Sequence, residues 1–333
     1  MISRINRALA IAAALVFGAG SALVFGSGSA RAADWDMPTP YPDSNFHTRN
    51  IVQFAADVDK ATGGAIKIKV YANGSLFRHP EIKNAVRGGQ APLGEILLSN
   101  FSHENPIFAV DSLPFLASNY DESAKLWAAS RGAVDKILRQ QGLMALYAVP
   151  WPPQGIYAKK ELKTMDDLRG IKLRTYNPAT SQLAKLAGAV PTQIEVPDLP
   201  TGFATGRVDA MITSPSTGVN GKAWDYVSDY HDTQAWLPNN IVVVNLKTFQ
   251  ALDKKTQDAI QGAAKAAEDR GLRASVSETE SMTKMLADKG MKVRKPSAEL
   301  MAGLKKIGDQ MTAEWVQKAG ADGAAILKAY RGK

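Results

Sequence analysis

Strand-like and helix-like segments alternate in a regular order near the start of this sequence, and the order restricts the folds that it can adopt. In residues 66–71 every second side chain is isoleucine or valine, as in a half-buried strand. A helix-like stretch precedes this strand (51–61), and residues 93–98 are almost continuously apolar, as in a buried strand. With a further strand at 35–40 and a helix at 80–87, the order predicts an α/β fold with parallel strand pairing.

A proline-rich stretch in the middle of the chain, residues 151–157, indicates a division into two lobes. Prolines stiffen the backbone and remove hydrogen-bond donors, which suits a crossover between lobes. The apolar strand 241–244 would return the chain to the first lobe, and the long helical segment 256–289, with a weak point at Gly271, would brace both. We expect lobe I to comprise residues 33–153 plus about 245–282, and lobe II residues 154–244 plus about 283–333.

The first 32 residues have the pattern of an export signal. Arg4 and Arg7 precede an apolar stretch (8–25), and residues 30–32, Ala-Arg-Ala, form a cleavage site. A membrane anchor is the alternative, but glycines and a serine interrupt the apolar run and no stop-transfer pattern follows it. Cleavage after Ala32 removes three arginines and no acidic residue, so it lowers the formal charge from +8 to +5.

Cysteine, histidine and charge patterns exclude several classes of protein. The chain has no cysteine, hence neither a disulfide framework nor a lipid-bearing N-terminal cysteine, and we expect a soluble protein of the Gram-negative periplasm. Basic residues are scattered among acidic ones, so nucleic-acid binding is not expected. The 4 histidines lack metal-type spacing and no nucleotide or hydrolase motif is present, so we expect neither a metal nor a cofactor. A hydrolase with two distant carboxylates stays open as an alternative.

Arg174 is the strongest candidate for a binding residue. In the short strand 171–174, Arg174 lies on the face opposite the apolar side chains. Asn177 and Pro178 then form a helix N-cap and a first-turn proline. A guanidinium between a strand end and a helix N-terminus can hold a carboxylate by two hydrogen bonds. The alternatives are an exposed surface arginine or one paired to an internal acid.

Residues 167–177, Asp-Leu-Arg-Gly-Ile-Lys-Leu-Arg-Thr-Tyr-Asn, resemble the strand–helix signature of the TRAP transporter solute-binding proteins of the DctP type. Residues 63–76 and 111–116 also resemble the N-terminal lobe of that family. The resemblance implies a periplasmic, monomeric protein whose two lobes close on a small organic acid, with Arg174 on its carboxylate. It also implies delivery of the ligand to the small and large membrane subunits of a permease. An ABC-type binding protein and an exported enzyme on a similar two-lobed scaffold are the alternatives.

Two departures from the family pattern affect the expected ligand. Many members carry a second arginine in the crossover stretch, where this chain has Gln154, and often an asparagine where this chain has Thr213. One carboxylate plus hydroxyl or apolar groups is therefore expected rather than two carboxylates. The further candidate ligand-binding residues are Trp151, Tyr176 and Trp236 as aromatic walls or plain core packing, Asn177, Ser214 in the polar loop 214–218, and Glu95, which faces the cleft or pairs with Arg87.

Overall fold

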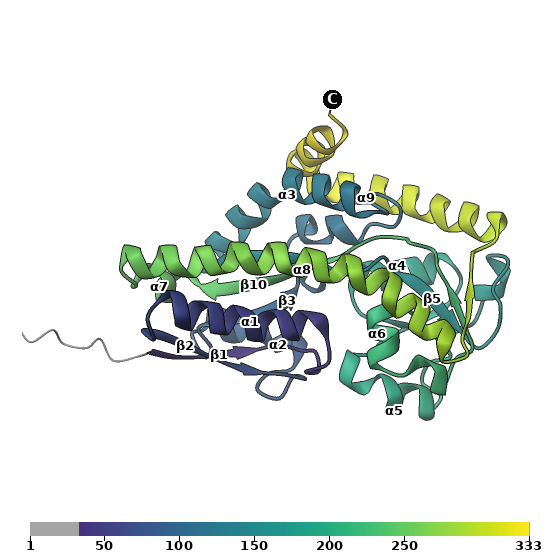
Figure 1. Ribbon diagram of the computed structural model, residues 1–333. Helices are drawn as coiled ribbons and strands as arrows, with labels where there is room; N and C mark the ends of the chain where they lie inside the picture. Colours follow the sequence, from purple (N-terminus) through teal and green to yellow (C-terminus); the bar gives the residue numbers. More distant parts are fainter. Residues whose placement is uncertain (1–32, 333) are drawn as a thin grey trace, which may run out of the picture. The chain divides into compact units, whose positions relative to one another are not determined.

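The structure is a computed structural model that describes residues 33–332, so the predicted signal peptide lies outside the described residues. Within this range the strands form three sheets (Figure 1): β1–β2, the antiparallel sheet β3–β10–β4, and a mixed sheet in the order β11–β9–β5–β8–β6–β7. The strands are β1 (Ala33–Pro38), β2 (Ile66–Tyr71), β3 (Leu93–Leu97), β4 (Leu143–Pro150), β5 (Gly155–Ala158), β6 (Lys172–Thr175), β7 (Val190–Gln193), β8 (Ala210–Thr213), β9 (Asp229–His231), β10 (Asn239–Asn245) and β11 (Lys292–Arg294).

Helices pack against these sheets and supply most of the remaining core. α1 packs on β2, α2 on β3, α3 on β4, and α4 on β6 and β7. The helices are α1 (Phe46–Ala61), α2 (His79–Arg87), α3 (Tyr120–Gln140), α4 (Pro178–Leu186), α5 (Leu199–Ala204), α6 (Pro215–Asn220), α7 (Leu246–Gln250), α8 (Lys254–Asp288) and α9 (Ala298–Arg331), with short 3-10 turns η1 (Leu98–Phe101), η2 (Pro106–Ser112), η3 (Asp166–Leu168), η4 (Val196–Asp198) and η5 (Ala223–Asp225).

The α/β prediction is confirmed, whereas the expected parallel pairing holds only in part. β1 and β2 pair in parallel, as do β6 and β7. β3 instead pairs antiparallel with β10, a strand 142 residues later in the chain from Leu97 to Asn239. The prediction failed for β3 because it assumed that consecutive strands are neighbours, while β10 enters this sheet on its return from the mixed sheet.

Two extended segments carry the chain between the sheets that contain β4 and β5, and they lie side by side. Residues 151–154 join β4 to β5, and residues 232–238 join β9 to β10. Their backbones are hydrogen-bonded: the Trp151 amide donates to the Pro238 carbonyl at 2.8 Å, and the Gln154 amide donates to the Trp236 carbonyl at 3.0 Å. The crossover predicted at the proline-rich stretch and the return at β10 are thus found, while the exact lobe boundaries stay a prediction.

α8 is the long helix expected to brace both parts of the chain (Figure 1). It packs against α1 and β4, which meet it around Ala267 and Gly271 in its middle, and against α6 and β11. The helix is continuous at Gly271, where a weak point was expected. A Cβ at Gly271 would lie 2.4 Å from Val149 Cγ2, so the glycine serves the close approach of α8 to β4.

Two further segments differ from or refine the sequence prediction. The expected polar loop 214–218 is the start of α6, because the Ser214 side chain accepts a hydrogen bond from the Thr217 amide and Pro215 occupies the first turn. Two closing helices were expected, and α9 contains both, separated by Gly320 with φ 60° and ψ −140°.

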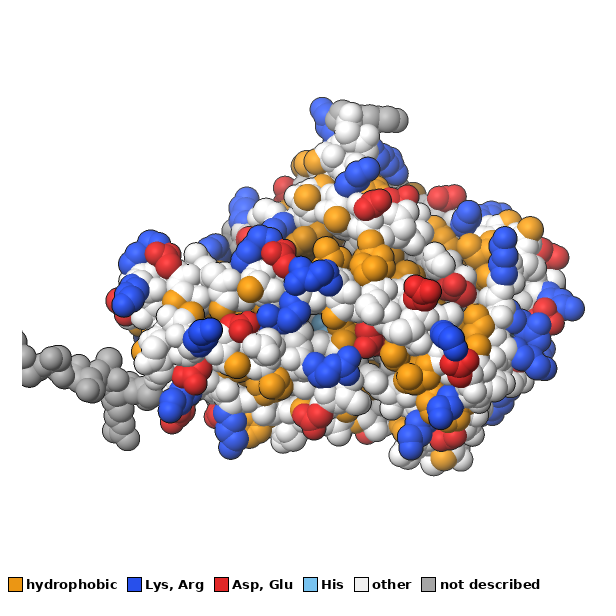
Figure 2. All heavy atoms as spheres, in the orientation of Figure 1, with side chains coloured by type: hydrophobic (Ala, Val, Ile, Leu, Met, Phe, Trp, Pro, Cys, Tyr) orange, Lys and Arg blue, Asp and Glu red, His pale blue; other side chains and the backbone are white. Residues whose placement is uncertain are grey.

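Charged side chains of both signs are interspersed on the face shown in Figure 2. Along α8, Lys254 pairs with Asp258 and Lys284 pairs with Asp288 one turn away. Such exposed pairs add little stability, typically about 0.3–0.5 kcal/mol each, so the core of this cysteine-free chain carries most of it.

Candidate ligand-binding site

A cavity lies where the two crossover segments meet the ends of several strands. Elements of the β3–β10–β4 side and of the mixed sheet both contribute to its wall. Its lining residues are Tyr41, His79, Leu97, Trp151, Gln154, Arg174, Tyr176, Glu195, Val196, Thr213, Ser214, Thr217 and Pro238.

Arg174 is the cationic group of this cavity. Its residue is 1% exposed, so it is not the surface arginine that the sequence left as an alternative. Nε donates to the Ile194 carbonyl at 2.8 Å, and Nη1 lies 3.5 Å from the Ile212 carbonyl. Among residues 33–332 no carboxylate lies within 4.0 Å of its guanidinium. Burial lowers the pKa of Arg174, and the nearby Glu195 charge opposes that effect.

The strand register and the helix cap explain this placement. Arg174 lies in β6, paired opposite Thr192 of β7 and Met211 of β8. Asn177 caps α4 by accepting from the Thr180 amide at 2.8 Å. β6 therefore ends close to the positive end of a helix, a position that favours bound anions.

A chain of hydrogen bonds fixes one wall of the cavity. Trp236 Nε1 donates to the Tyr176 hydroxyl at 3.1 Å, which donates to Gln154 Oε1 at 3.0 Å. Gln154 Nε2 donates to the Pro152 carbonyl at 2.9 Å. The indole N–H of Trp236 can only donate and the Pro152 carbonyl can only accept, so the two ends together fix the direction of the chain. Burial raises the pKa of Tyr176, so its hydroxyl keeps its proton and can donate.

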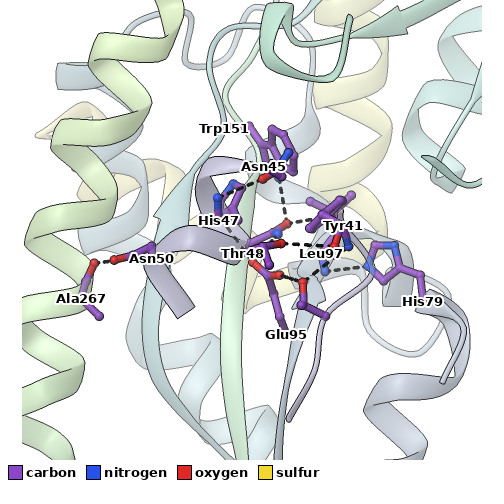
Figure 3. Close-up of polar contacts among 12 residues, drawn as sticks. Tyr41, Asn45, His47, Thr48, Asn50, His79, Glu95, Leu97, Trp151 and Ala267 are labelled. Carbon is purple, nitrogen blue, oxygen red and sulfur yellow. Dashed lines mark hydrogen bonds and ion pairs between the residues drawn. The ribbon is translucent and has the colours of Figure 1, made fainter. Parts of the chain in front are cut away.

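A second network lies behind the opposite wall, and Figure 3 shows Tyr41, Glu95 and Trp151 of it. Asn240 Oδ1 accepts from Trp151 Nε1 at 2.9 Å and from the Tyr41 hydroxyl at 3.2 Å. Its Nδ2 donates to Glu95 Oε1 at 2.8 Å, and the Thr39 hydroxyl donates to Glu95 Oε2 at 2.5 Å. Glu95 therefore supports the two aromatic side chains from behind.

Glu95 does not pair with Arg87, so the structural partner predicted from the sequence is wrong. Its partners are Thr39, Asn240 and the His47 ring, whose Nδ1 lies 3.4 Å from Oε1. Arg87 is near the end of α2 and exposed, whereas Glu95 is 1% exposed within β3. Burial raises the pKa of Glu95 to about 7, against the hydrogen bonds from Thr39 and Asn240, which lower it.

Glu195 and His79 form the other polar pair of the cavity. His79 Nδ1 lies 3.2 Å from Glu195 Oε2, and the Leu97 amide donates to His79 Nε2 at 3.1 Å. Burial alone would raise the pKa of Glu195, but the hydrogen bond to His79 and the Arg174 charge lower it below its ordinary value. The cavity thus contains one cation and one carboxylate.

Most of the predicted ligand-binding residues come together at this cavity. The six that line it are Arg174, Gln154, Trp151, Tyr176, Thr213 and Ser214. Trp236, Asn177 and Glu95 do not line it. Trp236 holds Tyr176, Asn177 caps α4 and donates to the Ser99 hydroxyl at 2.8 Å, and Glu95 acts through Asn240.

Sequence reasoning missed seven lining residues. Glu195 directly precedes the 3-10 turn η4, and an acidic residue between Ile194 and Val196 was a usable signal. His79 was considered only as a metal ligand, and no spacing pattern connects it with Glu195. The missed residues are Tyr41, His79, Leu97, Glu195, Val196, Thr217 and Pro238.

The part of the chain that the structure describes contains no group of three or more potential metal-binding side chains. None of its helices is long and apolar enough to cross a bilayer.

Residues 39–318 match the family described as bacterial extracellular solute-binding protein, family 7, or DctP. The chain belongs to this family. Members are solute-binding receptors and not enzymes, so the resemblance drawn from residues 167–177 is confirmed, and the alternative of an exported enzyme is set aside.

Solved structures extend the match to the whole DctP fold. DctP6, an extracytoplasmic solute receptor of Bordetella pertussis that binds pyroglutamic acid, is 46% identical, with a TM-score of 0.89 over 90% of this chain and 100% of that one. A marine metagenome TRAP solute-binding protein specific for pyroglutamate is 40% identical, with a TM-score of 0.89 over 91% and 99%. This likeness confirms the two-lobed periplasmic binding protein fold.

Curated relatives match over shorter stretches. A solute-binding protein of Albidiferax ferrireducens is 25% identical over 54% of this chain and 53% of its own length, so the match spans about half of that relative.

Proposed function

We propose that this protein captures a small organic monocarboxylate in the cavity around Arg174 and delivers it to the small and large membrane subunits of a TRAP-type permease. The observation that carries this proposal is a buried guanidinium that lines a cavity without a carboxylate partner among residues 33–332. Burial of a charge is costly unless the charge is paired, so a ligand carboxylate would complete the site. Export to the periplasm through the segment 1–32 belongs to the same proposal.

The lining favours one carboxylate over two. Arg174 is the only Lys or Arg among the lining residues, and Glu195 adds a negative charge. Gln154 uses its amide oxygen to accept from Tyr176 and its amide nitrogen to donate to Pro152, so it is already held on both sides. Apolar contacts from Leu97, Val196 and other lining side chains suit the carbon skeleton of the ligand.

Pyroglutamate is the first ligand that we propose for this chain. The support is similarity: two solved relatives with 46% and 40% identity bind this lactam acid. Pyroglutamate carries one carboxylate, one N–H donor and one carbonyl on a small ring, which agrees with the single guanidinium and the polar groups of the cavity.

The test is calorimetric titration of pyroglutamate into the wild type, Arg174→Ala and Arg174→Lys. Arg174→Ala leaves a buried ligand carboxylate unpaired, which costs about 3–5 kcal/mol, so affinity should fall at least about 100-fold. Arg174→Lys keeps a positive charge but loses the planar guanidinium, so its affinity for pyroglutamate should fall by about 10-fold or more.

The matched control is Arg169→Ala, which removes an exposed guanidinium five residues earlier that pairs with Asp166 on the surface. This variant should bind like the wild type. Unchanged affinity in Arg174→Ala, with a folded protein by circular dichroism, would refute the role of Arg174. A wild type that binds none of a panel of organic acids would refute the proposed function.

A further inference from the structure

The cavity wall contains a carboxylate, Glu195, which does not help to bind an anion. Glu195 lines the cavity together with Arg174, and its side chain is 15% exposed. Among the described residues the two are not within ion-pair distance of each other, so Glu195 does not neutralise Arg174 by direct contact. A carboxylate so close to the anion site weakens the binding of any anion unless the ligand also makes use of it.

The hydrogen bonds of His79 determine the role of this carboxylate. The Leu97 amide donates to His79 Nε2, so this nitrogen must carry a lone pair rather than a proton (Figure 3). The proton of the neutral ring is then on Nδ1, which donates to Glu195 Oε2. Glu195 is thereby held as an ionised acceptor.

A carboxylate has about four acceptor positions, and His79 occupies one of them. Glu195 can therefore accept a further hydrogen bond from a molecule in the cavity. The hydrogen bond to His79 and the charge of Arg174 keep the pKa of Glu195 below its ordinary value despite burial, so it stays ionised at neutral pH.

We propose that Glu195, positioned by His79, determines specificity: it accepts a hydrogen bond from an N–H or O–H of the ligand and rejects ligands that would place a second carboxylate there. This inference rests on the proposed function, since it requires the ligand carboxylate to bind Arg174. A cyclic amide acid satisfies both groups at once, because its carboxylate meets the guanidinium and its N–H meets Glu195. A dicarboxylate would instead bring two like charges together.

The inference is tested with a pair of ligands that differ in a single group. In 3-oxocyclopentane-1-carboxylate a CH₂ replaces the ring N–H of pyroglutamate, while the carboxylate and the carbonyl are kept. Calorimetry on the wild type should show pyroglutamate binding roughly 10- to 100-fold more tightly, because the analogue leaves a buried acceptor without its donor.

Glu195→Gln is the decisive variant. The Nδ1–H of His79 still needs an acceptor, so it orients the glutamine oxygen toward itself and leaves the NH₂ group toward the cavity. The preference for pyroglutamate over the analogue should then fall to within about 3-fold, and glutarate, a dicarboxylate, should gain affinity relative to wild type.

Asp198→Asn is the matched control. Asp198 lies three residues after Glu195 and pairs with Arg78, the neighbour of His79, but neither lines the cavity. The control therefore removes an acid–base contact between the same two segments while leaving the cavity wall intact. The ratio of its affinities for pyroglutamate and for the analogue should equal that of the wild type. A merely structural role of Glu195 would lower both affinities together and leave their ratio unchanged.

The outcomes separate the two proposals. If the wild type binds both ligands equally, or if Glu195→Gln keeps the wild-type ratio, the role of Glu195 is wrong while the carboxylate site stands. If the wild type binds neither ligand nor any other organic acid tested, the proposed function fails and this inference fails with it.

Discussion

Replacement of Glu95 by glutamine should make the stability of this protein less dependent on pH. Glu95 is fully enclosed and accepts hydrogen bonds from the Thr39 hydroxyl and the Asn240 amide. A glutamine can keep both contacts, because its oxygen can accept from Asn240 and its NH₂ can donate to the Thr39 oxygen. The substitution therefore removes the titrating charge with little change in packing.

The size of the effect follows from the pKa. Burial raises the pKa of Glu95 from 4.5 to about 7 in the folded protein. Between these values the folded state holds a proton that the unfolded state has released, so wild-type stability falls as pH rises. The stabilisation of the folded state by protonated Glu95 is fully present below pH 4.5 and is lost as the pH rises through 7. The loss amounts to about 3 kcal/mol. For about 300 residues this corresponds to a Tm change of about 5 °C.

Neighbouring titratable groups require that the variant be compared with the wild type at each pH. His47 faces Glu95 from α1, and burial lowers its pKa, so its own contribution is lost as pH falls below 6.5. Burial raises the pKa values of Tyr41 and Tyr147, and the nearby Glu95 charge raises them further.

The assay is thermal unfolding of the wild type and Glu95→Gln from pH 5 to pH 8.5. The two Tm values should nearly coincide at pH 5, and the variant should be about 5 °C more stable at pH 8. Glu280→Gln on the exposed side of α8 removes the same charge from the surface and should follow the wild type. Parallel curves for wild type and Glu95→Gln would show that Glu95 is ionised throughout, and the burial argument would be wrong.

Three further substitutions test the packing of α8 and a buried ion pair. Gly271→Ala should destabilise the protein by about 1–3 kcal/mol in denaturant titrations, because its Cβ would lie 2.4 Å from Val149 Cγ2. The control is Gly262→Ala on the same helix, where the added Cβ meets open space. This variant should be more stable than the wild type by up to about 1 kcal/mol. Glu104→Gln should also destabilise the protein, by roughly 1–3 kcal/mol, because it leaves the fully buried Lys83 ammonium without its charged partner, and an unchanged midpoint in urea would contradict this.

The sequence was informative about Arg174 because every step of that prediction was local. Strand alternation set the face of Arg174, and Asn177 with Pro178 set the start of the next helix. The short β6 and the cap of α4 depend on neighbours within a few residues. In the structure Arg174 lines a cavity, and its contact with a ligand stays a prediction.

Local rules were misleading where a tertiary partner decides the structure. Gly271 was expected to weaken α8, since glycine lowers helix propensity. The close packing against Val149 instead makes the absence of a side chain necessary, and the helix continues. The antiparallel pairing of β3 was hidden for the same reason, because β10 is far away in sequence.

Some residues of the candidate site follow a general rule of α/β sheets, and others do not. Arg174 and Thr213 lie in strands of the mixed sheet, where polar residues near strand ends mark a ligand site. His79 comes from a helix of the other side, and its meaning depends on Glu195, 116 residues later. No period or spacing connects these two, so only the folded chain reveals their contact. Polar residues near strand ends can thus be found from sequence by a general rule, whereas a contact such as that between His79 and Glu195 becomes visible only in the folded chain.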